Sequence, residues 1–309
     1  MSMKKIQFNF MGMRKVTSIV SALLIIFSVF TLSYQGLNLG IDFTGGTLVE
    51  VGYPEAVNLD KLRQSFSDSE FNDVAIQYFG SAKEILIRIP PQQGLNSADV
   101  SSKLLNLLSS NNFSAEMRRV EFVGPQVGEE LREDGGLAML YALLCIMVYI
   151  AFRFQMRFSV GAVSALIHDV IITLGFFSIT RFSFDLTILA ALLAVIGYSL
   201  NDTIVVFDRV RENFRKIRDK TPVEVFNISL NQTLSRTLMT SFTTLLVLTA
   251  LFLLGGEIIH GFSVALIFGV LIGTYSSIYI ASPVTLMLGI KKEDLMPVKK
   301  EGVDLENQP

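Results

Sequence analysis

Long apolar stretches separated by polar residues dominate the pattern of this chain. Six of them reach the length of about 20 residues that a helix needs to cross a bilayer. The first follows basic residues, but it is longer than the roughly 7–15 residues of a signal-peptide core and no small-residue cleavage site follows, so we expect a retained anchor. The pattern predicts a polytopic α-helical membrane protein with six transmembrane helices, at residues 16–35, 137–156, 160–179, 186–207, 237–256 and 262–284.

Residues 37–134 follow a different pattern, in which short alternating stretches are interleaved with stretches of helical spacing. Alternation indicates strands, and apolar residues three or four apart indicate helices. The order strand, helix, strand, strand, helix, strand is the signature of a ferredoxin-like α+β domain. Asn58 and Ser97 are expected N-caps, and Gly80 with Ser81 is an expected tight turn. The strands are expected at 47–53, 73–80, 84–90 and 114–124, and the helices at 58–68 and 97–110.

The distribution of lysine and arginine predicts the orientation. With six spans, the basic short segments 1–15, 152–159, 208–235 and 291–309 all fall on one side, and such segments are normally cytoplasmic. The domain, with fifteen acidic and eight basic residues, is then periplasmic. The expected organisation is a cytoplasmic N-terminus at 1–15, the first transmembrane helix at 16–36, the periplasmic domain with its connectors at 37–134, a five-helix bundle at 135–290 including a cytoplasmic link at 208–235, and a cytoplasmic tail at 291–309.

Charged residues make up only 17% of the chain and hydrophobic residues make up 50%. This composition is typical of membrane proteins. Cys145 stands alone, so no disulfide forms within the chain, and we expect it to be buried. His168 and His260 lack ligand spacing, which argues against a metal site. The exported domain holds no catalytic constellation. We therefore expect no enzyme activity, no cofactor and no nucleic-acid partner.

The 208–235 link is basic and amphipathic, which suits the anionic headgroups of membrane lipids. We interpret it as an interfacial helix, a break at Thr221 and Pro222, and a second short helix that starts with a capping box closed by Glu224.

Two glycine-bearing connectors flank the domain. The first, LGIDFTGGT at 39–47, contains Gly40, Asp42, Gly45 and Gly46. The second, FVGPQVGEEL at 122–131, contains Gly124 and Pro125. Such residues break regular structure. Each connector is either a turn at the membrane exit or a hinge on which the domain moves against the bundle.

Polar residues inside the apolar spans are the candidate functional groups, because a charge within a bilayer is costly and marks function by default. Asp202 lies in the fourth span near Tyr198, Ser199 and Asn201. Arg236 begins the fifth span, and we expect it to pair with Asp202 either as a static ion pair or as a proton-coupled switch, in which the aspartate titrates because arginine cannot.

Other polar positions extend this candidate network. Thr240 belongs to a threonine-rich stripe that continues from Arg236. In the third span, His168 and Asp169 are either a buried packing pair or a proton relay. Gly269 and Gly273 form a GxxxG pattern, which permits close helix packing within the chain or between subunits.

These motifs resemble those of the SecD/SecF family, membrane subunits of bacterial protein export and a branch of the RND superfamily. The resemblance covers nearly the whole chain and rests on GIDFTGGT (40–47), FVGPQVGEEL (122–131), ALIHDVIIT (165–173), VIGYSLNDTIVVFDRVREN (195–213) and TLSRTLMTSFTT (233–244).

The resemblance implies an RND-like bundle in the bacterial inner membrane. It also implies assembly with SecD, association with the SecYEG channel, YajC and YidC, and late steps of preprotein translocation driven by the proton motive force. The proton-linked aspartate and arginine of the family map onto Asp202 and Arg236. The alternatives are an RND-type exporter of small molecules or lipids and a structural scaffold.

Overall fold

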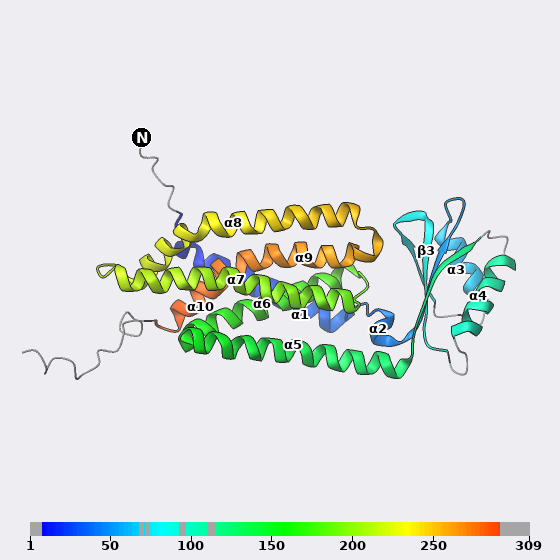
Figure 1. The fold of residues 1–309 in the computed structure, drawn as a ribbon, viewed down its shortest axis with the longest axis horizontal. Helices are drawn as coiled ribbons and strands as arrows, with labels where there is room; N and C mark the ends of the chain where they lie inside the picture. Colours follow the sequence, from blue (N-terminus) through cyan, green and yellow to red (C-terminus); the bar gives the residue numbers. More distant parts are fainter. Residues whose placement is uncertain (1–7, 68–70, 72–73, 93–96, 111–114, 291–309) are drawn as a thin grey trace, which may run out of the picture.

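A computed structural model describes residues 8–67, 71, 74–92, 97–110 and 115–290. A bundle of long helices carries a small sheet with two helices at one end (Figure 1). We call this the domain end and the opposite end, where α1 begins, the terminal end. The elements are η1 (Met11–Met13), α1 (Arg14–Gln35), α2 (Ile41–Thr44), β1 (Gly46–Gly52), α3 (Leu59–Ser67), β2 (Ala75–Phe79), β3 (Ser81–Ile89), α4 (Ser97–Ser110), β4 (Glu116–Val123), α5 (Pro125–Arg153), α6 (Met156–Thr180), α7 (Leu186–Lys216), α8 (Pro222–Leu254), α9 (Glu257–Ser276), the π-helical η2 (Ser277–Ala281) and α10 (Ser282–Met287).

The six predicted spans are confirmed as six helices long and apolar enough to cross a membrane. Several helices run further than the apolar pattern. The interpretation of the 208–235 link as separate interfacial helices is wrong, because α7 continues to Lys216 and α8 begins at Pro222 and is continuous with the fifth span. The predicted capping box is present: the Thr221 side chain accepts from the Glu224 backbone N–H and the Glu224 carboxylate accepts from Thr221. Polar residues therefore extend these helices beyond the bilayer.

The small domain has the predicted ferredoxin-like topology. Its four antiparallel strands lie in the order β2-β3-β1-β4, with α3 and α4 on the face turned away from the bundle (Figure 1). Asn58 caps α3 by accepting from Asp60 N–H at 2.9 Å. Gly80 makes the β2–β3 turn at φ +73°. The predicted cap at Ser97 has a side chain outside the described part of the chain.

The second connector is the junction between β4 and α5. Helix α5 begins at Pro125, directly after an extended Gly124, and runs without a break into the membrane span. Proline suits the first helical turn because its missing N–H has no intrahelical partner there. The last strand of the domain therefore ends at Val123, and the expected connector at 122–131 comprises the end of β4, Gly124 and the first turns of α5.

Small residues let the bundle helices approach closely. A side chain at Gly273 would lie 2.9 Å from Cβ of Ser199, and one at Gly269 would overlap Val195, both on α7. The GxxxG pair therefore packs within the chain. Cys145 was expected to be buried but is exposed, because most of the apolar part of α5 faces away from the other helices.

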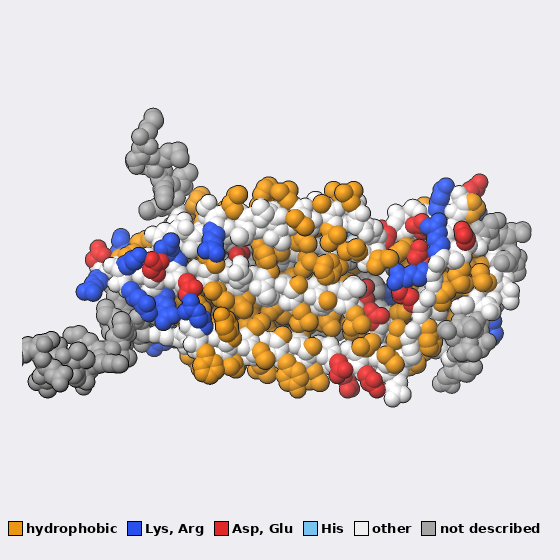
Figure 2. Space-filling view, viewed as in Figure 1, with side chains coloured by type: hydrophobic (Ala, Val, Ile, Leu, Met, Phe, Trp, Pro, Cys, Tyr) orange, Lys and Arg blue, Asp and Glu red, His pale blue; other side chains and the backbone are white. Residues whose placement is uncertain are grey.

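The surface of the bundle is apolar along its length, and basic side chains gather at the terminal end (Figure 2). A chain with six apolar helices and such a surface is a multi-pass membrane protein.

Candidate functional site

The most completely bonded polar group in the bundle is Asp169 on α6, which is fully buried. Its Oδ2 accepts hydrogen bonds from Ser199 on α7 at 2.6 Å and from Ser276 at the end of α9 at 2.8 Å. Its Oδ1 lies 2.9 Å from Nδ1 of His168. This carboxylate thus joins three helices. Ser199, expected beside Asp202, bonds to Asp169 instead, because its face of α7 is turned toward α6 and α9.

His168 extends this cluster toward the first helix. Its ring stacks near that of Tyr275, with centroids 6.1 Å apart. The Tyr275 hydroxyl donates to the Thr17 carbonyl at 3.0 Å and lies 2.9 Å from Oγ of Ser21, both on α1. His168 Nε2 is buried and has no hydrogen-bond partner within the described part of the chain. The predicted pairing of His168 with Asp169 is present, in a network that links α1, α6, α7 and α9.

Asp202 on α7 has a contrasting environment. It is 2% exposed, it faces Thr240 on α8, and Arg236 is close enough to interact with it electrostatically. Its Oδ2 has no hydrogen-bond partner, and the same holds for the buried hydroxyls of Thr203 and Thr237, with all described residues considered. Buried polar groups are normally hydrogen-bonded, so the unbonded oxygen of Asp202 is available for another partner.

The expected direct contact between Asp202 and Arg236 is absent. Within the described residues, no ion pair of 4 Å or less joins them, and Arg236 is exposed. The long arginine stem allows the guanidinium to lie away from the bundle core while its chain stays in place. Thr240 Oγ1 donates to carbonyls of its own helix, at Arg236 and Thr237. The two residues lie on facing helices, α7 and α8, and the separated arrangement is compatible with the switch alternative of the prediction.

Of two other residues predicted to belong to the network, Tyr198 contacts neighbouring helices and Asn201 does not. Tyr198 joins the α7–α8–α9 contact, since its hydroxyl donates to Ser241 at 3.3 Å and Ser241 lies 2.7 Å from Thr274. Asn201 is exposed and lies outside the network. The reason is the helical rotation of about 100° per residue, which turns Asn201 outward when Asp202 points inward.

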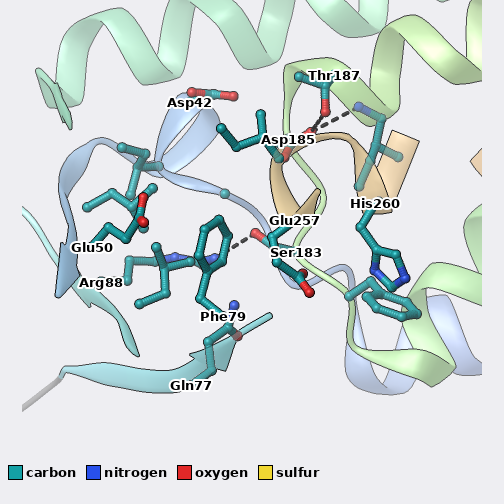
Figure 3. Close-up of a pocket in the computed structure, with 18 of the residues that line it drawn as sticks. Asp42, Glu50, Gln77, Phe79, Arg88, Ser183, Asp185, Thr187, Glu257 and His260 are labelled. Atoms are coloured by element: carbon teal, nitrogen blue, oxygen red, sulfur yellow. Dashed lines mark hydrogen bonds between the residues drawn. The ribbon is translucent and has the colours of Figure 1, made fainter. Parts of the chain in front are cut away.

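The joint between domain and bundle is a second polar site, around a cavity of about 450 Å³ (Figure 3). Arg88 on β3 reaches across it and donates to Ser183 Oγ at 2.6 Å and to the Leu39 carbonyl at 3.0 Å. Burial lowers the pKa of Arg88, and the negative charges of Asp185 and Asp42 oppose that shift. The guanidinium holds the sheet against the loop that precedes α7.

The first connector is fixed to the same loop. Gly40 N–H donates to the Phe184 carbonyl at 2.7 Å, and Asp42 Oδ2 accepts from Leu186 N–H at 3.0 Å. Gly45 and Gly46 have φ of +70° and +122°, values that favour glycine. The glycine pair is a tight turn between α2 and β1, so the connector is a turn in this structure. Its contacts link the N-terminus of α7 to the domain.

Sequence reasoning missed Ser276, Tyr275 and Arg88. Ser276 and Tyr275 belong to the polar TYSS run that follows the GxxxG pattern inside an apolar span, a signal that was available. Arg88 carries no local signal, because a charged residue within an alternating strand usually faces water. Among the described residues, no group of three or more metal-binding side chains occurs.

Two family models match this chain. The family model described as "Protein export membrane protein SecD/SecF, C-terminal" matches residues 103–291, and the "SecD/SecF GG Motif" model matches residues 35–53. The second match covers α2 and the Gly45–Gly46 turn.

Curated relatives extend over nearly the whole chain. The chain is 52% identical over 304 residues to the protein translocase subunit SecF of Vibrio alginolyticus, covering 97% of this chain and 96% of that one. It is 48% identical over 289 residues to the protein of the same name from Escherichia coli O157:H7, covering 92% and 90%.

A solved structure shares the fold. The crystal structure of SecDF from Thermus thermophilus, described as a translocon-associated membrane protein, superposes with a TM-score of 0.85 at 38% identity. The match covers 93% of this chain and 39% of that chain, so this chain spans about two fifths of the length of SecDF. SecDF in a super-membrane-facing form gives a TM-score of 0.69. With these matches, its six apolar helices and its ferredoxin-like domain, this multi-pass membrane protein belongs to the SecD/SecF family.

Proposed function

We propose that this chain acts with SecD in protein translocation across the bacterial inner membrane, and that proton movement through its bundle drives late steps of the process. Asp202 is the proton-binding group, and Arg236 is its charge partner. One observation carries the proposal: a buried carboxyl with an unbonded oxygen faces α8, while its potential cationic partner lies apart and exposed.

Protonation would switch this pair between two arrangements. An ionised Asp202 attracts Arg236, by about 4 kcal/mol at 4 Å for an effective dielectric constant of 20. A protonated Asp202 loses that attraction, which suits the separated arrangement seen here. A proton that crosses 100 mV releases about 2.3 kcal/mol, enough to shift a two-state equilibrium roughly fifty-fold. Protonation of one carboxyl could therefore change the position of α7 relative to α8.

Helix α7 can transmit that change to the domain. Asp202 lies 16 residues after Leu186, which corresponds to about 24 Å of helix. At that end of α7, the backbone of Leu186 binds Asp42 and the preceding loop binds Arg88. A shift of α7 would therefore move both contacts with the domain. The basic terminal end (Figure 2) supports cytoplasmic termini and a periplasmic domain.

An exposed face of α7 supports assembly with SecD. Ala190, Ala194, Gly197 and Asn201 recur at helical spacing and are all exposed. Small residues permit close helix approach, and a polar side chain is costly against lipid. This face suits a transmembrane helix of a partner better than acyl chains. We extend the proposed partners to SecYEG, YajC, YidC and the unfolded preprotein on family membership alone.

Asp202→Asn tests the proposal. We expect the variant to lose proton-gradient-dependent late translocation in inverted vesicles while ATP-driven initiation continues, because asparagine cannot exchange a proton. Asp208→Asn is the matched control, since Asp208 is on the same helix but pairs with Arg153 near the surface. Normal gradient dependence in Asp202→Asn would exclude the proton-coupled role and favour a scaffold.

A further inference from the structure

The terminal end of the bundle carries a groove that none of the contacts above explains. It lies between the first turns of α1, the start of α8 and the α10 segment, and it encloses about 760 Å³. Most of its wall is apolar, with Ile19, Val223, Leu286 and Met287 among the lining side chains. This volume is within the range of about 300–1,000 Å³ typical of small-molecule sites.

The depth of the groove matches the edge of a bilayer. Helix α1 has 22 residues, or about 33 Å, close to the roughly 30 Å of the hydrocarbon core. Arg14 and Lys15 stand at its first turn, and Ile19 lies one turn deeper. Ile19 is 61% exposed and Met287 85% exposed. The part of the wall around Ile19 therefore lies at acyl-chain depth, while the two cations lie at headgroup depth.

The charge of the groove is unbalanced. Within the part of the chain that the structure describes, no acidic residue lines it and neither Arg14 nor Lys15 forms an ion pair. Other cations at the terminal end do have acidic partners: Arg153 pairs with Asp208, and Lys216 with Glu212. The groove thus offers two unneutralised cations above an apolar wall.

We propose that this groove binds an anionic phospholipid, with its phosphate at Arg14 and Lys15 and an acyl chain along Ile19, Leu286 and Met287. Basic pockets between transmembrane helices on the cytoplasmic side are suited to anionic headgroups. The charge selects an anionic lipid over a zwitterionic one, and the apolar wall selects a lipid over free phosphate. The site is independent of the Asp202 switch.

The absence of tryptophan from the chain allows a direct test. Met287→Trp places a single fluorophore in the groove at an exposed position. The full chain is reconstituted into symmetric phosphatidylcholine vesicles that contain either dibrominated phosphatidylglycerol or dibrominated phosphatidylcholine, and bromine quenching is titrated. We expect phosphatidylglycerol to associate roughly thirtyfold more strongly than phosphatidylcholine, as two cations near the surface predict. Because both leaflets are identical, insertion direction does not affect the result.

Two variants and a second reporter make the test decisive. In the Met287→Trp background, R14Q/K15Q should bring the two lipids to within about twofold of each other. R211Q/K216Q removes two cations from the same end outside the groove and should keep the preference. Leu254→Trp, at the domain end of α8, should show no preference. Equal quenching of Met287→Trp by the two lipids overturns the proposal. Absence of quenching by either lipid also overturns it, because it would mean that protein, such as residues 291–309, fills the groove.

Discussion

The α+β domain and the helix bundle both bury apolar side chains, but they differ in how many polar side chains they bury. The domain core is apolar, with Val49, Ile87 and Leu104 fully buried, and its buried polar residue among those described is Thr47. The bundle exposes large apolar side chains such as Leu246, and it also encloses many buried polar side chains. Those on the helices α6 to α9 are Ser159, His168, Asp169, Thr173 and Ser178 on α6; Ser199, Asp202, Thr203 and Asn213 on α7; Ser229, Thr233, Thr237 and Ser241 on α8; and Ser263 and Ser276 on α9.

The difference follows from the two solvents. In water, burial of apolar surface drives folding. In a bilayer, lipid tails are as apolar as leucine, so close packing and hydrogen bonds between helices take over. The domain is therefore held together by its apolar core, while the bundle also encloses many polar groups. Substitutions of one kind should have effects of different size in the two regions.

The largest contrast is expected from truncating apolar residues. Ile87→Ala should destabilise the domain by about 2–5 kcal/mol, because it leaves a cavity in a close-packed core. Leu246→Ala, at a lipid-facing site 55% exposed, should cost less than about 0.5 kcal/mol, because lipid fills the space. Hydrogen exchange of the strand peptides and thermal stability in detergent measure the two effects. Similar losses in both variants would contradict the comparison.

Glycine substitutions at two positions in the long helices should change stability in opposite directions. Gly269→Ala forces a methyl group into Val195 on α7, and such overpacking costs up to about 3 kcal/mol. Gly136→Ala, where no atom lies within 4 Å of an added Cβ, should gain up to about 1 kcal/mol through helix propensity. Thermal unfolding followed by size-exclusion chromatography separates them. A gain at Gly269 would show that the α7–α9 contact is looser than described.

Loss of buried hydrogen bonds should lower the stability of the bundle by a smaller amount. Asp169→Ala removes the acceptor of Ser199 and Ser276 and the partner of His168. At about 0.6 kcal/mol for each of these bonds, we expect a total loss of about 2 kcal/mol. Asp208→Ala removes a surface ion pair with Arg153 and should cost less than about 1 kcal/mol. The same unfolding assay compares them, and equal losses would argue that the buried network contributes little.

The smallest effect is expected from pH acting on the domain. Burial raises the pKa of Tyr53 to about 12 from its ordinary value of 10.0, so the folded state favours the neutral phenol. Its contribution is complete below pH 10 and is lost as the pH rises through 12. Tyr53→Phe should remove this component of the pH dependence. Urea titrations at pH 9, 10 and 11 test this, and parallel declines in both proteins would contradict it.

Local patterns predicted much of the architecture. The six spans, the strand order, the Asn58 cap and the Thr221 capping box depend on periodicity and on residues close in sequence. Predicted helix ends and connectors were less accurate. Most of the connector expected at 122–131 is the start of helix α5, because Pro125 suits the first turn of a helix.

Residue patterns along the chain therefore predict which segments cross the membrane, how the small domain is wound, and that costly polar groups lie inside the bundle. The partners of those groups depend on the packing of the helices: Ser199 bonds to Asp169 rather than to Asp202, Asn201 and Cys145 point outward, and Arg236 stays apart. The physical reason is that lipid and protein interior are both apolar. A transmembrane helix then carries little contrast between its faces, and its rotation is set by packing against neighbours distant in sequence.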